Sequence, residues 1–321
     1  MIELNYELAQ QFLTKNNLLN CQIKKIAGDA SFRSYYRVNC GQKIFILMFA
    51  PPSHEDVRPF INVDNFLVAH GFSAPKIFAI DEVNGFLLLE DLGDDTYGRV
   101  LAKDNSSELP LYEKACDVLL ELHKCEILKN LSSYNHAVLF REVMLFVDWY
   151  LPLKKKVMNQ AEIQEYKYLW FELFDKLDKE NQTVVLRDYH ADNLMTLPNR
   201  DNYKQVGLLD FQDALIGSRA YDLVSLLEDA RRDVDENNRR KIFDYYVKKS
   251  GCDEEKFRTD YAILSLQRNM KIVGIFSRLS VRDNKHHYLD LLPRVIGFVE
   301  KRLKSQDQNF VEISKLIKKF I

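Results

Sequence analysis

The hydrophobic pattern of this chain changes near residue 90 from one typical of strands to one typical of helices. Up to that point, strand-like segments with alternating or continuous apolar residues cover 21–27, 33–38, 43–49, 76–80 and 85–89. Turn residues at 39–42 would join two of these strands as a hairpin, and a helix is expected over 58–70, ended by Gly71. The first ninety residues therefore predict an antiparallel sheet with one helix.

Helices are expected to dominate after residue 109. Apolar side chains recur at helical spacing over 111–122 and 163–177, and a last helix over 308–321 would pack an apolar stripe on the body of the protein. Two short apolar runs, 184–186 and 206–209, interrupt this pattern and predict a small hairpin within the helical part. We therefore expect an α+β protein with an N-terminal lobe over 1–90 and a C-terminal lobe over 91–321.

Composition excludes several classes of protein. Lys and Arg number 45 against 47 Asp and Glu, a balance that argues against a nucleic-acid partner. The longest apolar run, 44–52, is far shorter than the ~20 residues that span a bilayer, and the acidic start of the chain does not resemble a signal peptide. The five cysteines form no Cys-x-x-Cys pair, so we expect reduced thiols in a cytoplasmic protein with no membrane association.

One polar loop carries the residues that phosphoryl transfer requires. The sequence Arg-Asp-Tyr-His-Ala-Asp-Asn at 187–193 follows an apolar run, and Asp210 follows a second apolar run seventeen residues after Asn193. Asp188 and Asn193 are five positions apart, as in the catalytic loop of kinases. One carboxylate would orient the attacking hydroxyl and accept its proton, while an amide oxygen and a second carboxylate would bind Mg²⁺.

These motifs resemble the aminoglycoside phosphotransferase and choline-kinase-like superfamily. Asp210, Gly217 and Asp222 have the spacing of that superfamily's second motif. Further segments at 28–33, 48–52 and 86–93 are similar to one branch, the bacterial anomeric kinases that phosphorylate N-acetylmuramate and N-acetylglucosamine in cell-wall recycling. The resemblance extends over most of the chain and implies a protein-kinase-like fold of two lobes.

The resemblance also implies a role for each site residue. Asp188 would be the catalytic base, and Asn193 and Asp210 would bind Mg²⁺. The loop over the phosphates of ATP would contain Gly28, Asp29, Ala30, Ser31 and Phe32. The hinge that meets adenine would contain Glu90, Asp91 and Leu92. Residues expected to contact substrate or support the loop are Arg187, His190, Asp213 and Asp222, the last chiefly as a structural support. The implied partner is a small-molecule acceptor, most simply an amino sugar, and no protein partner is implied.

The chain departs from the superfamily pattern at two positions. Leu186 stands where the catalytic loop usually begins with His, a supporting residue whose loss we expect to be tolerated. The third strand usually carries a Lys that meets the phosphates, and this chain has Met48 or a neighbour there. Lys43, Arg33 and Arg58 are the candidate cations that could replace it.

Several alternatives remain open at the level of sequence. The same fold could act on an aminoglycoside, choline or another sugar, and an acidic cleft for an aminoglycoside could come from Asp213, Glu228, Asp229 and Asp233. The missing third-strand Lys favours a nucleotide-binding scaffold without activity. A two-metal hydrolase would need more ligands than this loop supplies, and the stretch from 210 to 222 is too short for the activation segment of a protein kinase.

Overall fold

The computed structural model describes residues 4–26, 32–305 and 307–321. The chain forms two compact units. The first contains Met1–Lys103 and Asp192–Asp213, and the second contains Asp104–Ala191 and Ala214–Ile321. The loop that carries Asp188 therefore passes from the second unit to the first after Ala191. The first unit is larger than the expected lobe of residues 1–90, and the division of the chain into functional lobes at that point stays a prediction.

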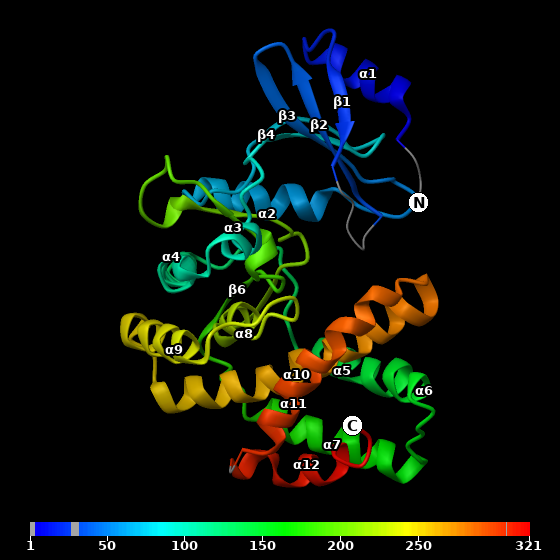
Figure 1. Ribbon diagram of the computed structural model, residues 1–321, viewed down its shortest axis with the longest axis vertical. Helices are drawn as coiled ribbons and strands as arrows, with labels where there is room; N and C mark the ends of the chain where they lie inside the picture. Colours follow the sequence, from blue (N-terminus) through cyan, green and yellow to red (C-terminus); the bar gives the residue numbers. More distant parts are fainter. Residues whose placement is uncertain (1–3, 27–31, 306) are drawn as a thin grey trace. The chain divides into compact units, whose positions relative to one another are not determined.

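A five-stranded antiparallel sheet forms the centre of the first unit (Figure 1). Its spatial order is β1 (Gln22–Lys25), β2 (Ser34–Cys40), β3 (Lys43–Phe49), β5 (Phe86–Glu90) and β4 (Ile77–Asp81). The expected hairpin is confirmed, because β2 pairs with β3 in antiparallel register and Gly41 takes the left-handed conformation in the turn. The strands and the helix α2 (Arg58–Ala69) lie where the sequence pattern predicts them.

The two faces of this sheet have different roles. Alternate residues such as Tyr36, Leu47 and Leu88 form an apolar core with α1 (Tyr6–Lys15), a helix that the sequence pattern did not indicate. Asn5 caps α1 by accepting hydrogen bonds from the backbone of its first turn. The other face carries Tyr35, Ile46 and Leu89, and these side chains line a cavity instead.

The expectation of reduced cysteines is wrong for one pair. Cys21 and Cys40 form a disulfide, while Cys116, Cys125 and Cys252 are free. The reason is the strand register, since Gln22 pairs with Asn39 and the two neighbouring cysteines are thereby brought together, with Cα atoms 4.4 Å apart. Spacing along the sequence alone gave no sign of this pairing.

Two separate two-stranded sheets replace the single hairpin expected from the sequence. The strand β6 (Gln182–Val185) pairs with β9 (Leu215–Ser218), and β7 (Leu194–Thr196) pairs with β8 (Val206–Leu208). The two apolar runs recognised in the sequence therefore belong to different sheets. Their true partners, β7 and β9, were not recognised in the sequence.

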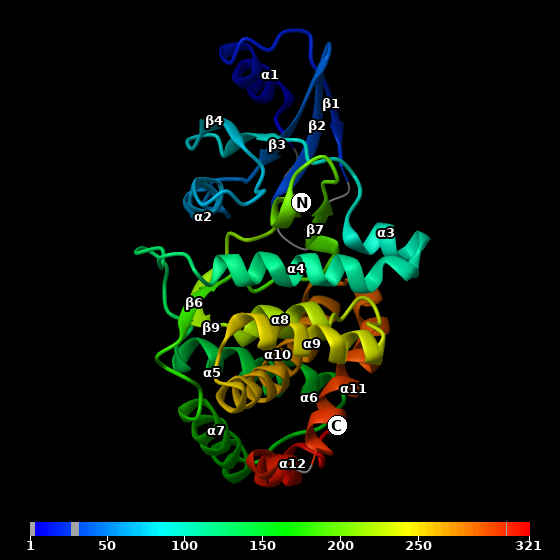
Figure 2. The same cartoon turned by 90° about the vertical axis from the view of Figure 1, so that its left-hand side faces the viewer.

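The second unit is mainly helical and is organised around one long helix, α10 (Glu254–Asp283). It packs against α5 (His136–Leu145), the π-helical turn Phe146–Tyr150, α8 (Ala220–Leu227) and α11 (Leu292–Leu303). Figure 2 shows α4 (Glu108–Leu122) over α8 and α9 (Glu236–Ser250), with α10 beneath them. The remaining helices include α3 (Tyr97–Lys103) in the first unit, and α6 (Leu151–Leu153), α7 (Gln160–Asp175) and α12 (Val311–Ile317) in the second.

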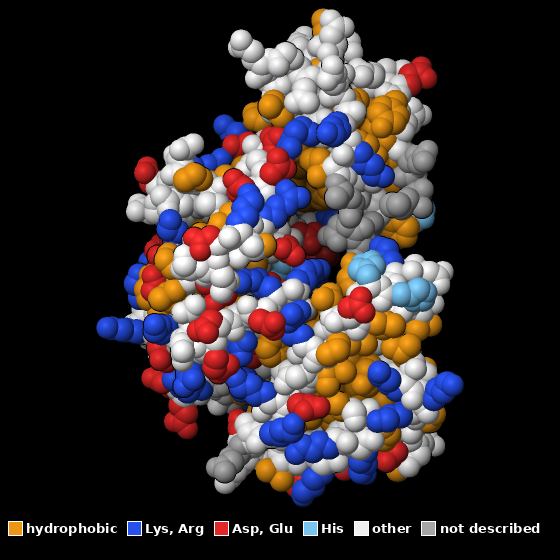
Figure 3. Space-filling view, in the orientation of Figure 1, with side chains coloured by type: hydrophobic (Ala, Val, Ile, Leu, Met, Phe, Trp, Pro, Cys, Tyr) orange, Lys and Arg blue, Asp and Glu red, His pale blue; other side chains and the backbone are white. Residues whose placement is uncertain are grey.

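The end of the chain packs on the second unit as expected. Phe310, Ile313, Leu316 and Ile317 are buried, and α12 contacts α7 and α11. Among the described residues, no helix combines the length and the apolarity that crossing a membrane requires. Positive and negative side chains are interspersed over the face seen in Figure 3, consistent with the nearly balanced charge of the sequence.

Candidate active site

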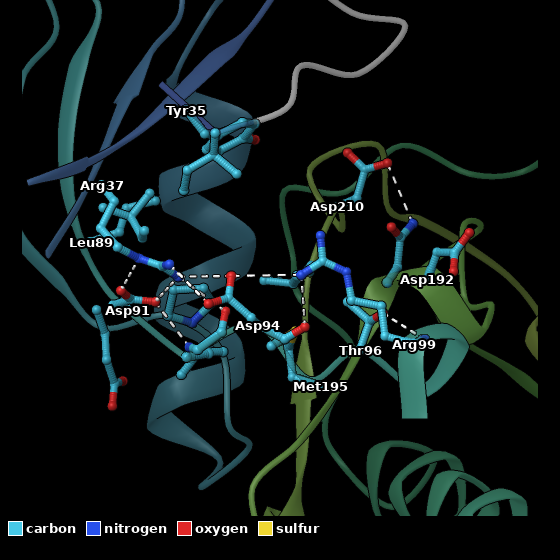
Figure 4. A pocket seen from close by; sticks show the side chains of 18 of the residues that line it. Tyr35, Arg37, Leu89, Asp91, Asp94, Thr96, Arg99, Asp192, Met195 and Asp210 are labelled. Atoms are coloured by element: carbon cyan, nitrogen blue, oxygen red, sulfur yellow. Dashed lines mark hydrogen bonds and ion pairs between the residues drawn. The ribbon is translucent and has the colours of Figure 1, made fainter. Parts of the chain in front are cut away.

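A cavity of about 480 Å³ lies within the first unit (Figure 4). Its walls come from the sheet, from the segment after β5 and from the β7–β8 region. The apolar lining includes Ile26, Tyr35, Ile46, Leu89, Met195 and Leu209. A cavity of this size with apolar walls and a few polar groups is typical of small-molecule sites. The predicted hinge residues Glu90, Asp91 and Leu92 and the predicted metal ligands Asn193 and Asp210 all line it.

An arginine that sequence reasoning missed holds the hinge. Arg37 on β2 donates to both oxygens of Asp91, at 2.6 and 3.1 Å, and to both oxygens of Asp94, at 2.9 and 3.1 Å. These hydrogen bonds outweigh partial burial and raise the pKa of the guanidinium further above its ordinary value. Arg99 on α3 reaches the same segment by donating to the backbone oxygen of Asp94 at 3.0 Å. The hinge is therefore fixed by charge-assisted bonds from both sides of the cavity.

The predicted metal ligands lie next to each other at one end of the cavity. The Asn193 amide is 3.5 Å from Asp210 Oδ2, and the backbone N–H of Leu209 donates to the carbonyl of Asn193 at 3.0 Å. Asp210 has a φ of 57°, a left-handed conformation that is uncommon for a residue other than glycine and is often found at functional sites. One carboxylate and one amide oxygen are the donor types that Mg²⁺ accepts when phosphate and water complete its shell.

This donor set fits Mg²⁺ on a polyphosphate better than a metal held by protein ligands alone. Within 4–26, 32–305 and 307–321, no group of three or more His, Cys, Asp or Glu side chains could hold a metal ion. Mg²⁺ usually binds through one or two carboxylates together with substrate phosphates.

The three candidate cations lie in very different environments. Lys43 is exposed at the start of β3, opposite Cys40 at the hairpin end. Arg58 is paired with Asp56 and its side chain is 73% exposed. Arg33, just before β2, is only 9% exposed, and its Nη2 lies 3.2 Å from Asp210 Oδ1. Of the three, Arg33 is thus the one at the metal-ligand end of the cavity.

The loop with Asp188 belongs to the second unit and is held by Asp222 on α8. The carboxylate of Asp222 accepts hydrogen bonds from the backbone N–H groups of Leu186, at 2.7 Å, and Arg187, at 2.8 Å. Burial raises the pKa of Asp222 to about 7, although these two hydrogen bonds oppose that rise. Arg187 has a φ of 71°. The chain thus makes a sharp bend directly before Asp188, and a buried carboxylate fixes it.

Cationic side chains surround Asp188. Burial alone would raise its pKa, but nearby positive charges, Lys271 foremost and then Arg187 and Arg268, outweigh that effect and hold the pKa below its ordinary value. Lys271 remains charged because its ion pair with Glu142, at 3.2 Å, outweighs burial and raises its pKa. Asp188 is therefore ionised at neutral pH, and an ionised carboxylate only accepts hydrogen bonds.

Glu142 organises the cations behind this loop. It accepts hydrogen bonds from Arg187 at 2.5 Å and from Gln267 at 2.9 Å, in addition to its ion pair with Lys271. Glu142 lies on α5, and these partners come from the loop that carries Asp188 and from α10. No sequence motif pointed to Glu142 or Lys271, because the contacts join residues that are 45 to 129 positions apart.

The other predicted residues have varied surroundings. His190 is buried, and Arg231 donates to its Nε2 at 3.1 Å; burial and this cation both lower its pKa, which keeps the ring neutral. Asp213 is exposed and accepts a hydrogen bond from Gln212 at 3.2 Å. Phe32 is 52% exposed, with its ring against that of His54. Gly28, Asp29, Ala30 and Ser31 lie outside the described residues.

Residues 22–257 match the model of a family described as the phosphotransferase enzyme family. Two curated relatives are named N-acetylmuramate/N-acetylglucosamine kinase. The one from Caulobacter vibrioides is 33% identical and the alignment covers 90% of each chain. The one from Pseudomonas aeruginosa is 36% identical, with 91% of this chain and 86% of the relative covered.

Solved structures show the same fold at low sequence identity. A choline kinase from Streptococcus pneumoniae superposes with a TM-score of 0.63 at 12% identity, covering 92% of this chain and 99% of that one. An ADP-bound aminoglycoside phosphotransferase superposes with a TM-score of 0.60 at 15% identity, covering 96% and 100%. At these identities the similarity establishes the fold alone.

Proposed function

The chain belongs to the phosphotransferase enzyme family, and we propose that it is an ATP-dependent kinase acting on the anomeric hydroxyl of N-acetylmuramate or N-acetylglucosamine. Its membership confirms the resemblance drawn from the sequence motifs. The observation that supports the proposal best is the adjacent pair Asn193 and Asp210 at one end of a cavity whose other end is a fixed hinge. Relatives aligned over about nine tenths of the chain carry the corresponding name. Because ATP is a cytoplasmic cosubstrate, the proposal places the reaction in the cytoplasm.

Asp188 would orient the acceptor and take its proton. In the proposed step, the C1 hydroxyl oxygen of the sugar forms a bond to the γ-phosphorus of ATP. The bond from that phosphorus to the β–γ bridging oxygen breaks, ADP leaves, and the hydroxyl proton passes to the Asp188 carboxylate. The cations around Asp188 keep it ionised before the reaction, so it can accept a hydrogen bond from a neutral hydroxyl.

Asn193 and Asp210 would hold Mg²⁺. When bound, the metal neutralises the charge that develops on the phosphate oxygens. The chain's own contribution is to present the two oxygen donors from a fixed backbone, since Asn193 and Leu209 are joined by a backbone hydrogen bond. The hinge held by Arg37 would present backbone groups to the edge of the adenine ring, between the apolar walls of the cavity.

Within this proposal, Arg33 replaces the missing third-strand lysine. It is buried beside Asp210, at the end of the cavity where phosphates would lie, whereas Lys43 and Arg58 are exposed. Arg33→Met should lower the affinity for ADP by roughly 10- to 100-fold without divalent metal, the range for losing a charge-assisted hydrogen bond. The affinity for adenosine, which has no phosphate, should not change. Arg58→Met is the matched control, and an equal ADP affinity in both variants would remove Arg33 from this role.

ATP consumption measured with a panel of acceptors tests the proposed function. The panel contains N-acetylmuramate, N-acetylglucosamine, glucose, choline and kanamycin, with Mg²⁺ present and Asp188→Asn as the blank. We expect turnover on the two N-acetyl sugars and a drop of roughly 10²- to 10⁴-fold in the variant. Turnover on another acceptor alone would overturn the sugar assignment, and full activity in a folded Asp188→Asn protein would overturn the role of Asp188.

A further inference from the structure

Two residues of the long helix α10, on the same face as Lys271, are partly exposed although their neighbours are buried. All residues from 260 to 274 are buried, and between 260 and 280 only Ile275 and Arg278 are partly exposed. Arg278 follows Lys271 by seven residues, which is about two helical turns, so the two side chains leave the helix in nearly the same direction. The helix face whose Lys271 acts on Asp188 is therefore accessible to solvent at Arg278.

Arg278 differs from Arg268, Lys271 and Arg282 on the same helix because its guanidinium has no hydrogen-bond or ion-pair partner among the described residues. Lys271 is paired with Glu142, Arg268 donates to Ser225 at 2.8 Å, and Arg282 forms two hydrogen bonds with Asp283. Arg278 has no hydrogen bond or ion pair within the described parts of the chain, and its Nε is buried without a partner. Burial and the nearby Arg282 lower its pKa, and the charge of Asp283, which is itself bonded to Arg282, opposes this only in part; an arginine remains charged at neutral pH. A half-buried cation of this kind is unfavourable unless a ligand supplies an anion.

We infer that Arg278 binds the carboxylate of the acceptor and thereby selects N-acetylmuramate over N-acetylglucosamine. This inference rests on the proposed function. The two sugars differ in the lactyl ether on C3 of N-acetylmuramate, which carries a carboxylate. That carboxyl carbon is six covalent bonds of about 1.5 Å from the C1 oxygen. The separation of Lys271 and Arg278 along the helix is about 10 Å, so a sugar with C1 at Asp188 has the length to place its carboxylate at Arg278.

The guanidinium suits this role by its shape as well as its charge. It can donate two parallel hydrogen bonds to a carboxylate, which an ammonium group cannot do. N-acetylglucosamine has only a hydroxyl at C3, so Arg278 would have no carboxylate partner when this sugar is bound. The contact should therefore add affinity for one sugar and make no difference to the other.

The test compares kcat/KM for the two sugars in wild type, Arg278→Met, Arg278→Lys and Arg282→Met. Arg278→Met should lower kcat/KM for N-acetylmuramate by roughly 10- to 100-fold, as expected for loss of a charge-assisted hydrogen bond. Its kcat/KM for N-acetylglucosamine should stay within about twofold of wild type. Arg278→Lys should show a smaller loss for N-acetylmuramate alone, and Arg282→Met, the exposed neighbour that already has a partner, should match wild type on both sugars.

The outcomes separate this inference from the function on which it rests. Equal losses on both sugars, or no loss on either, would overturn the role of Arg278 while the kinase activity stands. If wild type phosphorylates neither sugar, the proposed function fails, and calorimetric binding of N-acetylmuramate decides on Arg278 independently of turnover. Absence of that binding, or equal binding by wild type and Arg278→Lys, would overturn the inference. Thermal melting of each variant identifies loss of fold, and Arg278→Lys keeps the test valid if Arg278→Met does not fold.

Discussion

Replacing Asp222 by Asn should weaken both the fold of the second unit and the reaction. The Asp222 carboxylate is 1% exposed and accepts backbone hydrogen bonds from Leu186 and Arg187. An Asn side chain has one carbonyl oxygen, so at least one of these N–H groups loses its acceptor. Leaving a buried N–H donor without an acceptor costs about 1–3 kcal/mol. We therefore expect the free energy of unfolding near pH 6 to fall by about 2 kcal/mol.

The effect of this substitution should depend on pH in a defined direction. Burial raises the pKa of Asp222 from its ordinary value to about 7. For a group whose pKa is raised in the folded state, the stability it contributes is present below the unfolded pKa and is lost as pH rises through the folded pKa. Between pH 6 and 8, wild type should therefore lose about 1.4 kcal/mol more than Asp222→Asn. The difference between the two proteins should shrink accordingly.

Asp260→Asn is a control of the same chemistry in another place. Asp260 is also buried, accepts from the backbone N–H of Asp178 at 3.0 Å, and has a pKa raised to about 6 by burial. Its hydrogen-bond partners are Asp178 and Ser218, and neither belongs to the loop that carries Asp188. Denaturant unfolding should show a loss of stability in both variants, whereas kcat at a temperature where both are folded should fall, by tenfold or more, only in Asp222→Asn. Unchanged kcat in Asp222→Asn, or equal losses in the two variants, would refute the argument that Asp222 positions the loop.

Three further predictions concern the first unit. Wild type should lose stability between pH 6 and 8 partly through Asp64, because burial raises the pKa of its carboxyl to about 7. Denaturant unfolding should therefore show a smaller loss over this pH range in Asp64→Asn. Gly98→Ala should lower ATP affinity in calorimetry by several-fold, since a Cβ there would overlap the carboxylate of Asp192 in the cavity wall; unchanged affinity would show that the wall adapts. Thiol titration in urea without reductant should find three reactive cysteines, and a count of five would mean that Cys21 and Cys40 are not bonded.

The parts of this protein that the sequence predicts are those whose signals are local. The hairpin of β2 and β3 follows from an alternating run, a turn and an apolar run that are adjacent in the chain. The pairing of Asn193 with Asp210 follows from a motif whose spacing is characteristic of one superfamily. Each signal lies within a few residues or within a known motif, so no knowledge of long-range packing was required.

The parts that the sequence did not predict depend on contacts between distant residues. Arg37 is hydrogen-bonded to Asp91, 54 positions further along the chain, and Glu142 on α5 forms an ion pair with Lys271 on α10. An arginine in a strand or a glutamate in a helix has no local pattern that distinguishes it from a solvated surface residue. The missed strand partners have the same cause, because β6 pairs with β9 across the intervening strands β7 and β8.

The missing lysine of the third strand is explained by the charges that the first unit does contain. In protein kinases that lysine pairs with a glutamate on the following helix. Here β3 has the buried Met48, and α2 has Asp64, whose Oδ1 is buried without a partner in the described parts of the chain. A carboxyl group left without its cation has the raised pKa found for Asp64. Of the three candidate cations, Arg33 is the one that lies beside Asp210, whereas Arg37 and Arg99 are bonded to Asp91 and Asp94. On this argument Arg33, just before the second strand, supplies the positive charge that a third-strand lysine supplies elsewhere. Met48 is then no reason to favour a scaffold without activity.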